Sequence, residues 1–122
     1  MKIALPVNDT TQKTTICQSF GRAPFFLVYD SETEEKTYIT NDATTNQGGA
    51  GIKAAQNVVD SQAEVILTPR CGENAAQVIQ AAGIKLYKTI NDSVQDNITA
   101  FNAGRLKLLE EVHAGFNGRG GQ

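Results

Sequence analysis

The sequence predicts an α/β domain with a five-stranded mixed sheet and helices on both faces. Three observations lead to this fold class. Residues 64–68 contain an uninterrupted apolar run, which is typical of a strand buried on both sides in a parallel sheet. Residues 25–29 and 36–40 are strand-like and joined by a short polar turn, so the second strand should run antiparallel to its neighbours. From the first helix onward, helical and strand-like segments alternate, as in α/β proteins.

The first strand is expected at residues 2–7, which are apolar and are followed by an Asn-Asp turn signal. Residues 8–19 are polar and rich in threonine, and we predict a loop in which only Ile16 and Cys17 are suited to burial. Gly and Pro at 20–24 exclude a helix before the second strand.

Three helices are expected at about residues 51–61, 73–82 and 94–102, with the fifth strand at 84–87. Gly83 can close the second helix, and Ser93 can cap the start of the third. The apolar residues that share one face of the first helix at helical spacing are Ile52, Ala55, Val58 and Val59. We expect a single domain over residues 1–108 and a flexible Gly-rich tail over residues 109–122.

The predicted strand order along the chain brings four segments to one edge of the sheet. They are the loop after the first strand, the start of the second strand near Arg22, the glycine stretch 47–51 and the turn 69–72. Carboxyl ends of parallel strands form the ligand-binding edge of open α/β sheets. A binding site is therefore expected where these segments meet.

The glycine stretch places Gly48, Gly49 and Gly51 at the start of a helix, with backbone N–H groups open to approach. Such amides suit a phosphate, a carboxylate or an anionic metal–sulfur cluster. Two alternatives stay open: a tight turn with close helix packing, and a dinucleotide site, since Gly49, Gly51 and Ala54 match a loose G-x-G-x-x-A pattern. The long preceding loop and the lack of a suitable acidic strand end argue against the dinucleotide site.

Cys17 and Cys71 are the two cysteines, and both fall at the predicted edge. A thiolate is a soft ligand for iron or copper, so both are candidate metal ligands. Cys71 precedes a helix N-terminus, which is expected to lower its pKa. The alternatives are partly buried thiols without a role, or a disulfide between the two after oxidation.

Basic side chains at the edge have two interpretations each. Arg22 either contacts an anion or forms a surface ion pair with Asp9 or Asp42. Arg70 either joins it at the ligand or points to solvent. Lys53 lies in the first helical turn, where the helix dipole is unfavourable for a cation, so we expect it to contact solvent or ligand.

Composition and charge exclude several classes of protein. The net charge of −2 argues against nucleic acid as a partner, and no apolar run approaches the ~20 residues that span a membrane. The N-terminal residues lack a signal-peptide pattern, so a cytoplasmic location is expected.

A catalytic function is not expected. A two-metal nuclease would need several carboxylates together, but of Asp9, Asp30 and Asp42, Asp30 is predicted at the opposite edge. The single histidine, His113, lies in or beside the predicted tail, so a Cys/His nucleophile is also excluded.

Several stretches together resemble the dinitrogenase iron–molybdenum cofactor biosynthesis family. The motifs are SFGRAPFF at 19–26, GAGIKAA at 49–55, CGENA at 71–75, AAGIKLY at 81–87 and AFNAGRL at 100–106. The resemblance implies a three-layer α/β/α, ribonuclease H-like fold and a non-enzymatic role in binding or carrying metal–sulfur clusters. It also implies other cofactor-assembly or cluster-receiving proteins as partners. The related orange-protein-like branch is associated with a molybdenum–copper sulfide cluster.

The sequence departs from this family at two positions. Many relatives have His before the Phe-Gly-Arg segment and His before Gly-Ala, whereas Ser19 and Gly48 stand here. Direct ligation by histidine is therefore not expected.

We accordingly expect a carrier of an anionic cluster that contains molybdenum with iron or copper. The candidate cofactor-binding residues are Cys17, Ser19, Arg22, Gly48, Gly49, Ala50, Gly51, Arg70, Cys71, Gly72 and Asn74. The alternatives are a regulatory module that binds a small anion or nucleotide, and an interaction protein with a vestigial pocket.

Overall fold

A computed structural model describes residues 1–42 and 50–109 and confirms the α/β fold class. The elements in chain order are β1 (Lys2–Val7), β2 (Phe25–Asp30), β3 (Lys36–Thr40), α1 (Ala50–Asp60), β4 (Val65–Thr68), α2 (Glu73–Ala81), β5 (Lys85–Lys88) and α3 (Val94–Asn102). Gly48, Gly49 and His113 lie outside the described residues, as does most of the predicted tail. Within the described ranges, no helix has the length and apolarity needed to cross a membrane.

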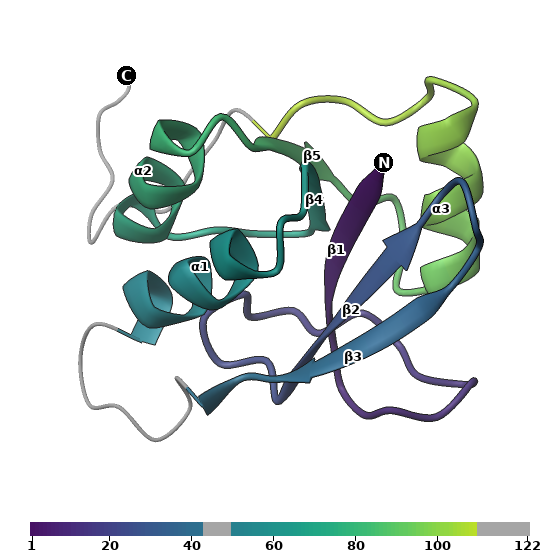
Figure 1. Ribbon diagram of the computed structural model, residues 1–122. Coiled ribbons are helices and arrows are strands. Elements are labelled where there is room, and N and C mark those ends of the chain that lie inside the picture. The colour runs from purple at the N-terminus through teal and green to yellow at the C-terminus, as the bar shows by residue number, and fades with distance from the viewer. Residues whose placement is uncertain (43–49, 110–122) are drawn as a thin grey trace.

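The five strands form one mixed sheet in the order β3-β2-β1-β4-β5. β2 runs antiparallel to β1 and β3, while β1, β4 and β5 are parallel, as predicted. Helices α1 and α2 cover one face and α3 covers the other, which gives three layers (Figure 1). The carboxyl ends of β1, β3 and β4 therefore lie at the same edge.

Two hydrophobic cores lie on the two faces of the sheet. Along β1, Ala4 belongs to the core under α1 and α2, while Ile3 and Leu5 belong to the core under α3. The same alternation places Ile66 and Leu67 of β4 on opposite faces, which explains why a central strand is apolar throughout. Each such fully buried aliphatic side chain stabilises the fold by roughly 1.5–3 kcal/mol.

The buried face of α1 differs from the prediction at Ile52. The helix buries Ala50, Ala54, Ala55 and Val58, whereas Ile52 is 41% exposed. Small side chains let α1 approach α2 closely, and Ile52 is two residues, about 200°, around the helix from Ala50. The predicted apolar face was therefore wrong at this residue.

Both predicted helix signals are confirmed. The Ser93 side chain accepts a hydrogen bond from the Asp96 N–H at 3.1 Å and caps α3. Gly83 has φ +81° and closes α2, and Ile84 donates its N–H to the Ile79 carbonyl as part of that closure. This bond holds Ile84 at the end of α2, so β5 begins one residue later than predicted.

The segment after α3 covers the outer edge of β5. Lys88 donates its N–H to the Lys107 carbonyl at 2.8 Å, and Leu109 donates to the Leu86 carbonyl at 2.9 Å. Leu109 is also buried in the core under α2. The packed domain thus includes Leu109, which was predicted to start the tail, and residues 110–122 lie outside the described residues.

Candidate functional site

The loop after β1 lies against the turn after β4, as the topology predicts. Cys17 donates its N–H to the Pro6 carbonyl at 2.8 Å, so the loop stays beside the end of β1. The loop after β1 and the turn after β4 together line a surface hollow of about 310 Å³. Its lining residues are Gln18, Ser19, Phe20, Arg70 and Cys71. Three predicted site residues, Ser19, Arg70 and Cys71, are therefore brought together.

Phe20 anchors this loop in the core. Its side chain is buried, and its ring lies 5.1 Å from that of Phe26 in β2, centroid to centroid, at a tilt of 52°. It belongs to the same core cluster as Cys71 and Ala50. The sequence prediction omitted Phe20 and Gln18; a large aromatic inside a polar loop was the available signal for the first.

Gly21 brings the loop into contact with the first turn of α1. A Cβ atom on Gly21 would lie 3.1 Å from the Gly51 Cα atom and 3.2 Å from the Gly51 nitrogen. A Cβ atom on Gly51 would in turn lie 3.4 Å from that of Ala75 in α2. Gly51 therefore serves close helix packing, one of the two alternatives for the glycine stretch, and three segments meet at these contacts.

The first turns of α1 and α2 consequently lie side by side at this edge (Figure 1). The first N–H groups of a helix have no partner within it, and the dipole gives each N-terminus about half a positive charge. The first turn of α1 carries no acidic residue, while that of α2 carries Glu73. Gly72 precedes α2 in extended conformation without a side-chain cap, and Asn74 is exposed. The backbone thus contributes positive potential at the predicted edge.

The prediction for the Cys71 thiol was wrong. Cys71 is only 2% exposed, and burial raises its pKa to about 12. Loss of hydration of the thiolate outweighs the helix dipole, so Cys71 is a neutral thiol at physiological pH. Cys17 is partly exposed, and both cysteines are free. Among the described residues, no group of three or more His, Cys, Asp or Glu side chains could hold a metal ion.

The acidic partners considered for Arg22 are engaged elsewhere. The Asp9 carboxylate accepts hydrogen bonds from the N–H and hydroxyl of Thr11, which lower its pKa. Asp42 accepts a hydrogen bond from Asn57 and lies 4.0 Å from the Lys53 ammonium. Lys53 was predicted to contact solvent or ligand, and this ion pair is its observed contact. Arg22 itself is exposed at the edge.

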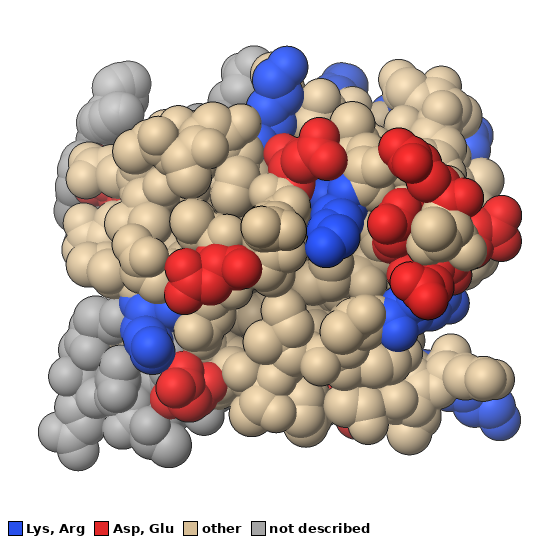
Figure 2. Space-filling view, in the orientation of Figure 1, with Lys and Arg blue, Asp and Glu red and all other residues tan. Residues whose placement is uncertain are grey.

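Carboxylates gather at the far end of the sheet, at the tip of the β2–β3 hairpin (Figure 2). Asp30 lies there and accepts a hydrogen bond from the Glu32 N–H at 2.9 Å, which lowers its pKa. Glu34 and Glu35 belong to the same turn. Asp30 therefore lies at the opposite end of the sheet from Asp9 and Asp42, as predicted.

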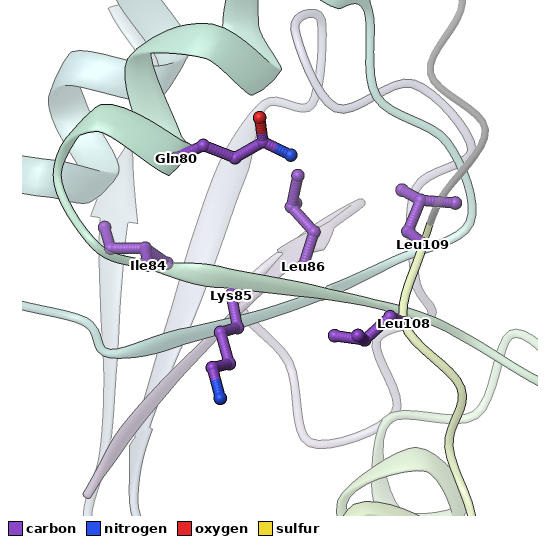
Figure 3. Close-up of a pocket in the computed structure, with 6 residues that line it drawn as sticks. All are labelled: Gln80, Ile84, Lys85, Leu86, Leu108 and Leu109. Atoms are coloured by element: carbon purple, nitrogen blue, oxygen red, sulfur yellow. The ribbon is translucent and has the colours of Figure 1, made fainter.

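A second hollow of about 370 Å³ lies at the other end of α2 (Figure 3). Its lining residues are Gln80, Ile84, Lys85, Leu86, Leu108 and Leu109. Figure 3 shows Lys85 directed away from Gln80 and Leu86. The lining is mostly aliphatic and lacks convergent polar groups, so this hollow does not extend the candidate site.

The three-layer fold, with two helix N-termini side by side at one edge of the sheet, defines the class as a small α/β protein. Residues 1–104 match the sequence model of the family described as "Dinitrogenase iron-molybdenum cofactor", and the chain belongs to this family. The resemblance inferred from the motifs is thereby confirmed.

Solved structures show the same fold. The apo form of the orange protein from Desulfovibrio gigas superposes with a TM-score of 0.85 and 33% identity, covering 89% of this chain and 92% of that one. A Thermotoga protein described as a NifB candidate gives a TM-score of 0.79 and 29% identity, covering 98% of each chain. An uncharacterized protein of Methanocaldococcus jannaschii is 29% identical over 113 residues, which cover 90% of this chain and 92% of that one.

Proposed function

We propose that this protein is a non-enzymatic, cytoplasmic carrier of an anionic metal–sulfur cluster that contains molybdenum with iron or copper. The observation that carries the proposal is the meeting of two helix N-termini with the Arg22 loop and the Arg70 hollow. The acidic turn of the β2–β3 hairpin lies at the opposite end of the sheet (Figure 2), away from this edge. Membership of the cofactor family and likeness to the orange protein support the same cargo.

The described residues fit a cargo held by charge and hydrogen bonds better than one held by several thiolates. Cys71 keeps its proton because its pKa is raised to about 12, which leaves Cys17 as the accessible soft donor. Guanidinium groups and backbone amides can cradle the sulfide faces of a thiometallate without coordinating the metal. Release to a cluster-receiving protein then requires no metal–protein bonds to Cys71 to be broken.

Titration with tetrathiomolybdate, alone and with Cu(I), under anaerobic conditions tests this function. We expect charge-transfer absorbance of the anion that stays with the protein through gel filtration and saturates with added probe, and an affinity that falls with rising salt because the contacts are ionic. An iron–sulfur precursor is the second probe. If neither probe gives a saturating band with the wild-type protein, the carrier function is wrong.

Arginine variants locate the cargo. Arg22→Gln and Arg70→Gln should each weaken binding by roughly 10- to 100-fold, the effect of losing a charge-assisted hydrogen bond. Arg105→Gln is the matched control, because Arg105 is an exposed arginine beyond α3. Equal losses in all three variants would indicate nonspecific attraction and contradict the site.

Cysteine variants separate the two modes of binding. Under the electrostatic mode, colour should survive both Cys17→Ser and Cys71→Ser. Loss of the band in Cys17→Ser alone would instead show that the Cys17 thiolate ligates the metal. Competition by inorganic phosphate at low millimolar concentration would favour the small-anion alternative at the same amides.

A further inference from the structure

A buried amide side chain lies behind the candidate site. Asn41 directly follows β3 and is 2% exposed. Its side-chain nitrogen donates to the carbonyls of Ala23 at 2.7 Å and Gly21 at 3.4 Å. Its side-chain oxygen accepts from the Nδ2 atom of Asn57 at 3.0 Å, and its backbone N–H donates to the Pro24 carbonyl at 3.0 Å. Asn41 therefore uses both its donor and its acceptor atoms.

These bonds join the segments that form the edge. Gly21 and Ala23 flank Arg22, so Asn41 holds the backbone on both sides of that arginine. Asn57 belongs to α1, whose Gly51 contacts Gly21. One side chain thus ties the arginine loop, the end of β3 and α1 together.

The chemistry of this position requires an amide. A buried aspartate would place a carboxylate against two carbonyl oxygens, and an aliphatic residue would remove the hydrogen bonds to those carbonyls and one of the two acceptors of the Asn57 amide. Asparagine supplies donors toward the loop and an acceptor toward α1 at the same time.

We propose that Asn41, with Asn57, is a positioning residue that fixes Arg22 relative to the first turn of α1. The backbone of Arg22 is then held at a fixed place beside that turn, where its side chain and the helix amides could bind the same anion. This inference rests on the proposed function for the identity of the anion. Asn41 does not contact the cargo; it acts through Arg22.

Asn97 provides a matched control on the other face of the sheet. It is fully buried, and its Nδ2 atom donates to the carbonyls of Asn91 at 3.0 Å and Ser93 at 2.7 Å. Its Oδ1 atom accepts from the Ile90 N–H at 2.8 Å. Asn97→Ala therefore removes a comparable set of bonds, but it loosens the loop before α3 and not the arginine loop.

The test is a double-mutant cycle on tetrathiomolybdate affinity. Asn41→Ala should weaken binding about tenfold, whereas Asn97→Ala should change it less than twofold. Because Asn41 acts through Arg22, Asn41→Ala should add little in the Arg22→Gln background. Equal losses for Asn41→Ala and Asn97→Ala, or multiplying effects of Asn41→Ala and Arg22→Gln, would overturn the inference. Should Asn41→Ala fail to fold, Asn57→Ala opens the same network from α1 and takes its place in the cycle.

A ligand-free measurement separates this inference from the carrier function. If the wild-type protein binds no probe, the carrier function fails, and amide hydrogen exchange still tests the network. Asn57→Ala should speed exchange at the Asn41 amide, which donates to the Pro24 carbonyl, and leave the amides of α3 unchanged. Unchanged exchange at the Asn41 amide would overturn the role of the network.

Discussion

The Cys71 thiol should react far more slowly with iodoacetamide than an ordinary cysteine. Its pKa is raised from 9.0 to about 12 by burial, and the thiolate is the reacting form. At pH 8 the thiolate fraction falls from about one in ten to about one in 10,000, so alkylation should slow about 1,000-fold before access is considered. Cys17→Ser leaves Cys71 as the single cysteine, and intact mass against time gives its rate.

Cys71→Ser, which leaves Cys17, and a short cysteine peptide are the references for this measurement. Addition of urea above the unfolding midpoint should restore the peptide rate in Cys17→Ser, because the slow rate is a property of the folded state. Alkylation of folded Cys17→Ser within tenfold of the peptide rate would refute the argument from burial.

Because the pKa of Cys71 is raised in the folded protein, the free energy of unfolding should depend on pH in the alkaline range. The unfolded thiol ionises near pH 9, whereas the folded thiol keeps its proton until about pH 12. The Cys71 contribution to stability is therefore complete below pH 9 and is lost as the pH rises from 9 to 12. The slope approaches about 1.4 kcal/mol per pH unit in this window. Cys71→Ala should lack this component in urea titrations at each pH.

Three further variants test the fold around the site by urea denaturation. Gly21→Ala should lower the free energy of unfolding by about 1–3 kcal/mol, because its Cβ would lie 3.1 Å from the Gly51 backbone; an unchanged midpoint would contradict that contact. Ser93→Ala should lower the free energy of unfolding by about 1 kcal/mol because the cap of α3 is lost. Hydrogen exchange of the Asp96 amide as slow as in the wild type would contradict this role of Ser93. Leu109→Ala should cost about 2 kcal/mol, whereas Leu108→Ala, at a 51% exposed position, should cost less than about 0.5 kcal/mol; similar losses would show that the two are packed alike.

The architecture was predictable because its signals are local. The apolar run Val65-Ile66-Leu67 identifies a central strand, and Gly83 and Ser93 mark helix ends through backbone geometry and hydrogen bonding. The buried face of a helix cannot be predicted from such local signals. Ile52 was misplaced because the small residues of α2, which decide the buried face of α1, lie more than twenty positions away in the chain.

The candidate site was predictable only as a meeting of segments. Strand directions place the Cys17–Arg22 loop and the Arg70–Cys71 turn at one edge, and the shared hollow confirms part of that prediction. The protonation of Cys71 depends on burial in a core that includes Phe20 and Ala50, so no local motif could indicate it. Asn41 looked like an ordinary loop residue because its partners are 16–20 positions away.

Paired helix N-termini have one consequence for how a cargo could leave. Peptide dipoles and guanidinium groups do not titrate near neutral pH, unlike the imidazoles that stand at the matching positions of many relatives. An anion held by the adjacent first turns of α1 and α2 would be bound with the same affinity from about pH 5 to 9. For such a cargo, acidification within this range would give no release signal through the protein's own groups. Unloading would follow competition from a surface that offers the anion more positive charge.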